Sequence, residues 1–304
     1  MTKETGAVRL NVDPQLPLES TNILIVGAGL IGGSYAQGLS RLGYRVRAIN
    51  RSQESIDFGL QQGFFAEGDC SLRPEWLAET NLLIIGLYPK AMLDWLRANQ
   101  QHLRPGTLIT DVSGVKSNIV DVAQSFLRPD LEFCASHPMA GKESSGIYNA
   151  DCRIFADANF IITPTERNTP QGIAAVRRLA ELLQFKTIRQ LDIHAHDHMI
   201  GFLSQLTHAI AVSLMTCNDD EGLKDFTGDS FRDLTRIARI NDVMWSELFL
   251  LNRDILIENI DCFSAELHRL RQLLQEDDRA GLQEMFRKSS ARRAEFDAGH
   301  KLSN

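Results

Sequence analysis

Residues 22–34 read NILIVGAGLIGGS, an apolar run that passes directly into a glycine-rich turn. The turn has G-x-G-x-x-G spacing, in which the first glycine makes a tight turn, the second lets the backbone approach a pyrophosphate, and the third allows close helix packing. A glycine-rich turn with a structural role only is the alternative, but the position after an apolar strand favours dinucleotide binding. The predicted cofactor-binding residues are Gly27, Gly29, Leu30, Ile31 and Gly32.

The end of the next predicted strand bears on the choice of dinucleotide. An NAD site normally offers a carboxylate there to the ribose hydroxyls, whereas this chain has Asn50, Arg51 and Ser52. A guanidinium suits a 2′-phosphate, so these residues favour NADP. In the alternative, Asn50 bonds the ribose of NAD and Arg51 is solvated.

Apolar strands alternate with amphipathic helices through the first part of the chain. The predicted strands are residues 22–27, 44–49, 82–87, 107–112, 131–136, 159–164 and 186–191, with helical patterns at 30–43, 90–103 and 172–185. This alternation predicts an α/β fold with a parallel sheet and crossover helices. From about Asp192 the strand patterns stop, which predicts an all-α second domain.

We therefore expect a flexible N-terminal arm at 1–20, a Rossmann-type dinucleotide-binding domain at 21–190, and a helical substrate-binding and dimerisation domain at 191–304. Within the helical part, apolar residues are spaced alternately by four and three, as in a helix that packs along another helix. They are Leu256, Ile260, Phe263, Leu267, Leu270 and Leu274. An internal bundle and a dimer interface both fit this seam, and the amount of apolar helix favours a homodimer.

The composition is that of a soluble, enzyme-sized protein. A chain of 304 residues, 43% hydrophobic and 23% charged, builds a core without disulfides. No unbroken apolar run approaches the roughly 20 residues of a membrane span, and the polar N-terminus lacks a signal sequence, so we expect a cytoplasmic protein. The net charge of -7 disfavours nucleic acid as a partner. Five scattered cysteines without a Cys-x-x-Cys pair predict no metal site.

A polar segment at 134–146, CASHPMAGKESSG, follows the predicted strand 131–136. Its prolines and glycines predict a loop, and open α/β sheets place their chemistry in loops at the carboxyl ends of strands. His137 is therefore a candidate catalytic residue. Because a single loop histidine is more often a structural or surface residue, other segments have to support it.

Three other segments carry polar side chains that packing alone does not require. Ser113 and Lys116 follow strand 107–112, where Ser113 equally suits a helix N-cap. The helix that begins near residue 193 carries a polar stripe that needs partners or a ligand, and its members are Asp197, Gly201, Ser204 and His208, with Gln205 beside them. The histidines at 194, 196 and 198 are expected to be an exposed run and not a metal site.

The third segment, at 231–239, contains Arg232, Arg236 and Arg239. Arginine binds carboxylates through two parallel hydrogen bonds, so one of the three is a candidate for an acidic substrate. Their spacing does not choose among them.

Together these motifs resemble the prephenate and arogenate dehydrogenases of tyrosine biosynthesis, from about Asn22 to at least Phe296. The resemblance is carried, in the family's order, by GAGLIGGS, DVSGVK, SHPMAGKESSG, HDHMIGFLSQLTH and FRDLTRIARINDVMW. It implies a dinucleotide-binding α/β domain joined to a helical dimerisation domain, with the active site in the cleft between them. The implied substrate is a small molecule, prephenate or arogenate.

The resemblance also implies roles for single residues. His137 matches the catalytic histidine that hydrogen-bonds the ring hydroxyl, and Arg236 matches the arginine that binds the ring carboxylate. Lys116 matches a substrate-side lysine, and His208 matches a histidine that lines the pocket. Glu143 matches an acidic residue near the mouth of the site, and Trp245 matches an aromatic residue near the domain interface. The chain departs from the family at Ser113-Gly114, where relatives usually read Gly-Ser or Ala-Ser. It also departs at Gln205, where some relatives carry His, and Gln205 is expected to bind the substrate side chain in place of that histidine. Ser113 is the candidate substitute for the missing hydroxyl.

The expected reaction is an NAD(P)-dependent oxidative decarboxylation in which neutral His137 takes the proton of the ring hydroxyl. Two alternatives are a β-hydroxyacid or imine reductase, which joins similar domains, and a cofactor-binding regulator without turnover. The first normally places a Lys or Asp donor on the helical domain, and no such motif stands out here.

Overall fold

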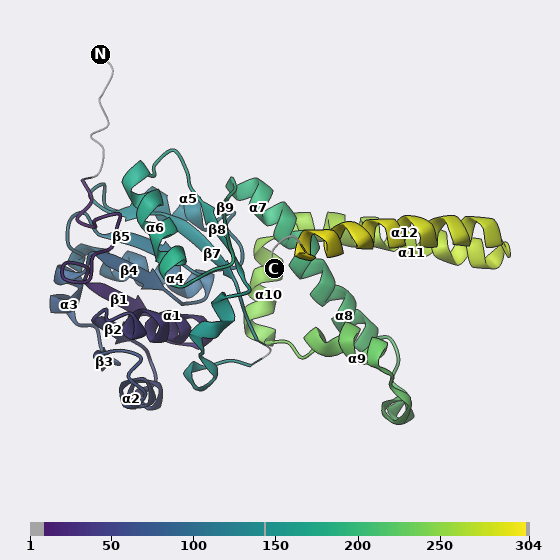
Figure 1. Cartoon of the computed structure of the whole chain (residues 1–304), viewed down its shortest axis with the longest axis horizontal. Helices are drawn as coiled ribbons and strands as arrows, with labels where there is room; N and C mark the ends of the chain where they lie inside the picture. Colours follow the sequence, from purple (N-terminus) through teal and green to yellow (C-terminus); the bar gives the residue numbers. More distant parts are fainter. Residues whose placement is uncertain (1–8, 143, 302–304) are drawn as a thin grey trace, which may run out of the picture. The chain divides into compact units, whose positions relative to one another are not determined.

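The computed structural model describes residues 9–142 and 144–301, and contacts divide the chain into two compact units, Met1–Arg253 and Asp254–Asn304. The first unit contains the whole α/β region and the helices up to α10 (Figure 1). The second contains a pair of long helices. The predicted domain boundary near residue 190 follows the change from α/β to all-α structure, and it stays a prediction.

The main sheet has six parallel strands in the order β3-β2-β1-β4-β5-β6. Their bounds are β1 Ile23–Val26, β2 Val46–Ile49, β3 Glu67–Asp69, β4 Leu82–Ile85, β5 Leu108–Asp111 and β6 Glu132–Phe133. Ile23 and Ile25 face one hydrophobic core, and Leu24 and Val26 face the other. Burial on both faces explains why β1 is apolar throughout and does not alternate between apolar and polar residues. The predicted α/β fold followed by helices is confirmed.

Helices cover both faces of this sheet (Figure 1). They are α1 Leu30–Arg41, α2 Gln53–Gln61, α3 Pro74–Glu79, α4 Pro89–Asn99 and α5 Val120–Phe126. Strand β3 was not predicted, because it is short and polar: Glu67 pairs with Arg45 and Arg47 at the sheet edge.

A second sheet of three strands, in the order β7-β8-β9, holds the central histidine. Its strands are β7 Ala135–Met139, β8 Asn159–Thr163 and β9 Thr187–Gln190, and α6, Pro170–Leu182, precedes β9. The predicted single strand 131–136 is thus split between two sheets, and the prediction of a loop at His137 is wrong. His137 lies in β7, opposite Ile161 of antiparallel β8. Pro138 is tolerated there because β7 is an edge strand of this sheet.

The N-terminal arm is packed in its described part. Leu10, Val12 and Leu16 are buried in the core, and the amide of Asn11 donates to the carbonyl of Gly106 at 2.8 Å. Flexibility is therefore the wrong prediction for residues 9–20, since three apolar side chains anchor them. Residues 1–8 lie outside the described residues.

A long helix begins the all-α part of the first unit. It runs as α7 Ile193–Ile200, a π-helical turn η4 Gly201–Leu206, and α8 Thr207–Thr216. It is 24 residues long, and a window of 18 residues within it has a mean hydropathy of 1.4, enough by length and composition to cross a membrane. The sequence argument against a membrane-spanning segment considered only unbroken apolar runs. In this helix the polar stripe interrupts the apolar residues, so that argument did not detect it. Core helices of soluble proteins meet the same criterion.

Shorter helices complete the first unit: η5 Glu221–Phe226, α9 Asp229–Thr235, η6 Arg236–Ala238 and α10 Asp242–Leu251. The second unit consists of α11 Arg253–Gln275 and α12 Arg279–Lys301. On α11, Leu267 and Leu274 of the predicted seam are exposed.

Candidate active site

The glycine-rich turn has the geometry that a dinucleotide requires. Gly27 adopts a φ of 91°, which only glycine takes readily. A Cβ at Gly32 would overlap the carbonyl oxygen of Gly27, whereas a Cβ at Gly29 would meet no atom within 4 Å. The first and third glycines therefore pack the turn, and the second leaves open space before α1, whose first residues are Leu30 and Ile31. A pyrophosphate fits that space at the helix N-terminus.

A cavity of about 430 Å³ adjoins this turn. It is lined by Gly27, Gly29, Asn50 and Arg51, with Tyr88 and Trp95 among the larger side chains. Its lining contains an arginine and no carboxylate among the described residues. Ser52 caps α2, since its hydroxyl accepts from the amide of Ser55 at 3.3 Å. The predicted cofactor residues thus lie around one cavity or next to it.

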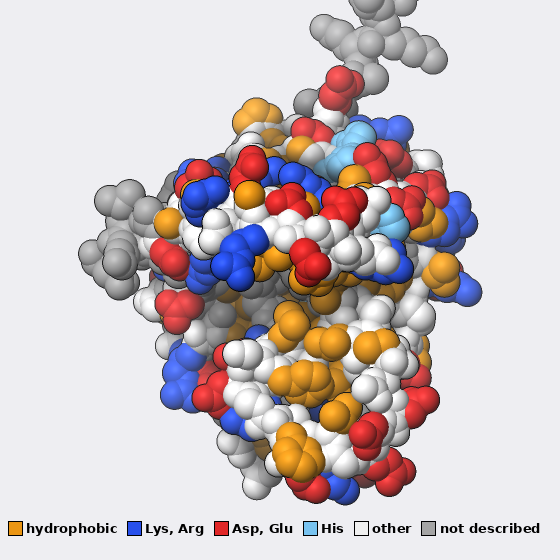
Figure 2. Space-filling view, turned by 90° about the vertical axis from the view of Figure 1, so that its right-hand side faces the viewer, with side chains coloured by type: hydrophobic (Ala, Val, Ile, Leu, Met, Phe, Trp, Pro, Cys, Tyr) orange, Lys and Arg blue, Asp and Glu red, His pale blue; other side chains and the backbone are white. Residues whose placement is uncertain are grey.

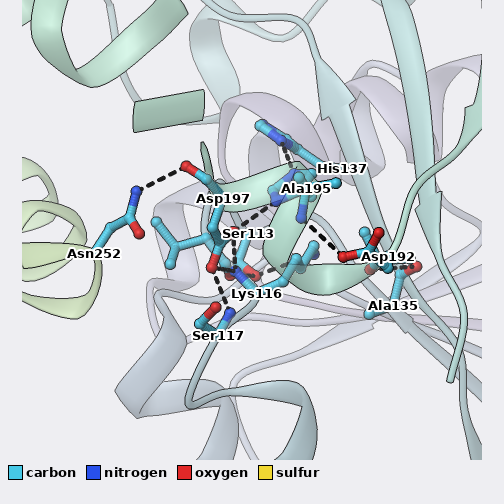
Figure 3. Close-up of polar contacts among 12 residues, drawn as sticks. Ser113, Lys116, Ser117, Ala135, His137, Asp192, Ala195, Asp197 and Asn252 are labelled. Atoms are coloured by element: carbon cyan, nitrogen blue, oxygen red, sulfur yellow. Dashed lines mark hydrogen bonds and ion pairs between the residues drawn. The ribbon is translucent and has the colours of Figure 1, made fainter. Parts of the chain in front are cut away.

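A chain of three polar side chains leads to His137 (Figure 3). Nδ1 of His137 lies 2.9 Å from Nε2 of His196, and Nδ1 of His196 lies 2.6 Å from Oδ1 of Asp197. His196 and Asp197 are fully buried in the first two turns of α7. The prediction of an exposed histidine run is therefore wrong for His196, although His194 and His198 are exposed.

Asp197 is held by backbone donors and by a neighbouring helix. The amides of Lys116 and Ser117 donate to its carboxylate at 2.9 and 2.6 Å. Asn252, just after α10, donates to its backbone carbonyl at 3.0 Å. Three segments distant in sequence thus meet at Asp197.

Lys116 forms a second buried cluster beneath this chain. Its side chain has 0% exposure, and Nζ donates to both oxygens of Asp111, at 2.8 and 2.7 Å, and to the carbonyl of Ser136 at 2.6 Å. Because its donors are used and no solvent reaches it, direct substrate binding by Lys116 is contradicted. The residue instead fixes the end of β5 against β7.

Ser113 belongs to the same cluster. Its hydroxyl donates to the carboxylate of Asp111, and no hydrogen bond joins it to His137 among the described residues. The adjacent glycine takes the place next to the ring: a Cβ at Gly114 would lie 3.7 Å from Nε2 of His137. Ser113 therefore does not replace the missing hydroxyl.

The charge states around His137 follow from burial. Burial, with His196 and Lys116 adding to it, holds the pKa of His137 well below its usual value. Burial also lowers the pKa of His196, against the opposing effect of Asp197. Burial alone would raise the pKa of Asp197, but the hydrogen bonds from His196 and Ser117 outweigh it and leave that pKa lowered. At neutral pH the arrangement is one carboxylate and two neutral imidazoles.

Two family models together match most of the chain. The nucleotide-binding domain of prephenate dehydrogenase matches residues 36–189, and the dimerization domain of prephenate dehydrogenase matches residues 192–288. The chain belongs to the prephenate dehydrogenase family. It is accordingly an NAD(P)-dependent oxidoreductase of the prephenate and arogenate dehydrogenase type, as the motifs predicted.

Individual relatives agree with this assignment. Prephenate dehydrogenase of Lactococcus lactis subsp. cremoris is 30% identical over 271 residues, which cover 87% of this chain and 74% of that protein. Cyclohexadienyl dehydrogenase of Zymomonas mobilis is 27% identical over 291 residues, 92% of this chain and 98% of that protein. The structure of A. aeolicus prephenate dehydrogenase in complex with hydroxyphenyl propionate and NAD+ superposes with a TM-score of 0.84 at 26% identity, covering 91% and 98% of the two chains.

On the helical side of this dehydrogenase, the predicted pocket residue His208 lies against Trp245, the predicted interface aromatic. The ring of His208 stacks on Trp245 with centroids 3.7 Å apart, and its Nδ1 donates to the carbonyl of Ser204 at 2.8 Å. This bond leaves the lone pair on Nε2. Arg236 is exposed at the start of η6, which packs against α8. Glu143 lies outside the described residues.

Gln205 does not line the site. Its amide donates to the carbonyl of Leu248 at 3.0 Å and accepts from Asn252 at 2.7 Å, with 1% of the residue exposed. The π-helical turn rotates Gln205 to the buried face beside Asp197, so a substrate role is contradicted. Helical π-turns often occur at functional sites, and here the turn connects α7 to the His208 helix.

Proposed function

We propose that this chain oxidatively decarboxylates a cyclohexadienol, prephenate or arogenate, with His137 as general base. The observation that carries the proposal is a neutral, partly exposed His137 whose Nε2 lies beside Gly114 and is not bonded by any described residue. A base with a depressed pKa is unprotonated at neutral pH and takes the hydroxyl proton directly.

The proton and electron balance closes without another reactant. His137 takes the proton of the ring hydroxyl while the carbon that bears it loses a hydride and becomes a carbonyl. An oxidised NAD(P), held through its pyrophosphate at the glycine-rich turn, would supply the hydride acceptor. Loss of CO₂ then moves its bonding electrons into the ring and onto the carbonyl oxygen. His137 returns the proton to that oxygen, and the product is a phenol.

Finer assignments belong to the same proposal. Arg236 fixes the ring carboxylate, as bidentate arginines do, and His208 and Trp245 lie on the substrate side. Arg51 in the cofactor cavity favours NADP over NAD. The protein acts as a cytoplasmic homodimer.

Apolar residues support the dimer. Large side chains are exposed along α8, η5 and α9, and Figure 2 shows hydrophobic side chains gathered in its lower half. We call this set the α8–α9 patch; it comprises Met215, Leu223, Phe226, Phe231 and Leu234. Contiguous exposed apolar surface of this kind is usually covered by a partner.

The test is reduction of each cofactor on addition of prephenate or arogenate, with CO₂ and the phenolic product measured alongside. The His137→Asn variant is expected to bind substrate but to lose at least about a hundredfold in kcat. Absence of reduced cofactor with both substrates would overturn the proposal. Near wild-type turnover in His137→Asn would remove His137 as the base.

A further inference from the structure

His196 and Asp197, the two buried residues hydrogen-bonded in series behind His137, have no role in the reaction described above. Asp197, His196 and His137 are joined in series by contacts of 2.6 and 2.9 Å, and only His137 has partial exposure. A buried carboxylate and a buried imidazole need hydrogen-bond partners, and the partner of His196 at Nε2 is a ring nitrogen of the base. Their alignment on one ring nitrogen of the base points to that base.

The hydrogen-bond donors around Asp197 set the direction of every proton in the chain. Its carboxylate accepts from the amides of Lys116 and Ser117 and has no proton to give. Nδ1 of His196 must therefore carry a hydrogen, which leaves the lone pair of neutral His196 on Nε2. Nδ1 of His137 must then carry a hydrogen to donate to that lone pair, so Nε2 of His137 is the basic nitrogen.

We propose that His196 and Asp197 are positioning residues that hold His137 in the tautomer with its proton on Nδ1, so that Nε2 is the proton acceptor. This role rests on the proposed function, because that function identifies the substrate whose hydroxyl proton Nε2 accepts. A hydrogen bond to one ring nitrogen is the usual means of selecting an imidazole tautomer.

The other side of the ring offers no such control. Gly114 beside Nε2 has no side chain, and the hydroxyl of Ser113 is used by Asp111. Orientation of His137 in this chain thus comes from the Nδ1 side. When His137 takes a proton, the imidazolium donates through His196 towards the carboxylate of Asp197. The nearby charge of Lys116 is balanced by Asp111 at 2.7 Å.

The direct test is the tautomer itself, measured without substrate or turnover. Full-length protein labelled with 15N-histidine gives ring-nitrogen chemical shifts, and His137→Asn identifies the signals of His137 among the eight histidines. We expect His137 with the hydrogen on Nδ1 at neutral pH. The tautomer with hydrogen on Nε2, or an equal mixture of the two, overturns the proposal.

A pair of substitutions at His196 separates positioning from packing. In His196→Gln, the amide oxygen accepts from Nδ1 of His137 and the amide nitrogen donates to Asp197, so the tautomer is kept. In His196→Leu, the acceptor is lost. We expect kcat to fall about tenfold or less in the Gln variant and at least about a hundredfold in the Leu variant, with KM for the substrate little changed in both.

The control is His198→Leu, an exposed histidine on the same helix, for which kcat should stay within about twofold of wild type, as for most surface substitutions. Equal losses in the Gln and Leu variants at position 196, with an unchanged His137 tautomer in both, overturn the proposal. Lack of turnover by the wild type refutes the proposed function alone, because the nitrogen shifts are read without any substrate.

Discussion

A Cβ placed on Gly114 would lie 3.7 Å from Nε2 of His137, an ordinary van der Waals distance. Gly114 is not one of the described glycines with a positive φ, so its backbone tolerates a side chain. The family usually has its hydroxyl at this position, and this chain has none. A serine at 114 restores that hydroxyl in reach of the base.

The first prediction concerns the pH profile of Gly114→Ser. Protonated His137 is inactive, so kcat/KM falls as pH falls through its pKa, which in the wild type lies below 6.5 because of burial. A hydroxyl that donates to Nε2 stabilises the neutral ring and lowers that pKa further. The acid limb of log kcat/KM should move to lower pH in Gly114→Ser and stay in place in Gly114→Ala. Identical limbs in both variants would show that the hydroxyl does not reach Nε2.

The second prediction concerns Arg236→Gln. Removing a bidentate partner of the ring carboxylate should raise KM for the substrate at least about tenfold, since hydrogen bonds to charged groups contribute about 1.5–3 kcal/mol. The KM for the dinucleotide should not change. Arg239→Gln, an exposed arginine three residues away, is the matched control. If Arg239→Gln raises KM and Arg236→Gln does not, the carboxylate is bound by the other arginine.

Local patterns explain which features could be predicted from the sequence. The glycine-rich turn after β1 and the apolar strands can be recognised from short stretches of sequence. Strands buried on both faces are apolar at every position. The interpretation of Gly27, Gly29 and Gly32 therefore follows from their spacing together with their position after an apolar strand. His137 was identified as a candidate because it follows an apolar stretch. A loop was predicted there because proline is usual in loops, but Pro138 lies in the edge strand β7 together with His137.

Long-range packing explains what was missed. His196 is buried because the start of α7 docks on β7 and on the loop at Lys116, contacts between residues about 60 to 80 positions apart. Nothing in the run His194, His196, His198 distinguishes the middle histidine. The acidic neighbour Asp197 was the available signal, since a histidine orienting a catalytic group often has a carboxylate behind it. The π-helical turn that buries Gln205 likewise has no sequence pattern of its own.

The third prediction concerns Lys116→Met. This change leaves the carboxylate of Asp111 buried without its cation, which costs about 3–5 kcal/mol. Guanidinium denaturation should show a loss of that size in the free energy of unfolding. Arg293→Met, which removes an exposed ion pair with Asp297, should lose less than about 1 kcal/mol. A stable Lys116→Met enzyme with a raised substrate KM would restore the substrate-binding role that the burial of Lys116 contradicts.

The fourth prediction concerns Arg51→Gln. If the guanidinium binds the 2′-phosphate, kcat/KM for NADP falls at least about tenfold and kcat/KM for NAD changes little, because only NADP has the phosphate. Arg45→Gln removes a nearby exposed arginine of the sheet edge that pairs with Glu67, and it should affect neither cofactor. A wild type that strongly prefers NAD, with Arg51→Gln unchanged on both cofactors, contradicts the assignment.

The fifth prediction concerns the α8–α9 patch. Phe226 is 86% exposed, more than any other large hydrophobic residue described, and aromatic residues dominate the energy of interfaces. If a second copy covers the patch, Phe226→Asp places a charge in a desolvated contact and weakens the dimer at least about tenfold in Kd. Sedimentation velocity over a concentration series measures this. Leu60→Asp, at an apolar residue of α2 that is 40% exposed, should leave the dimer unchanged. A dimer equally stable in both variants would place the interface elsewhere on the chain, and a monomeric wild type would contradict dimerisation itself.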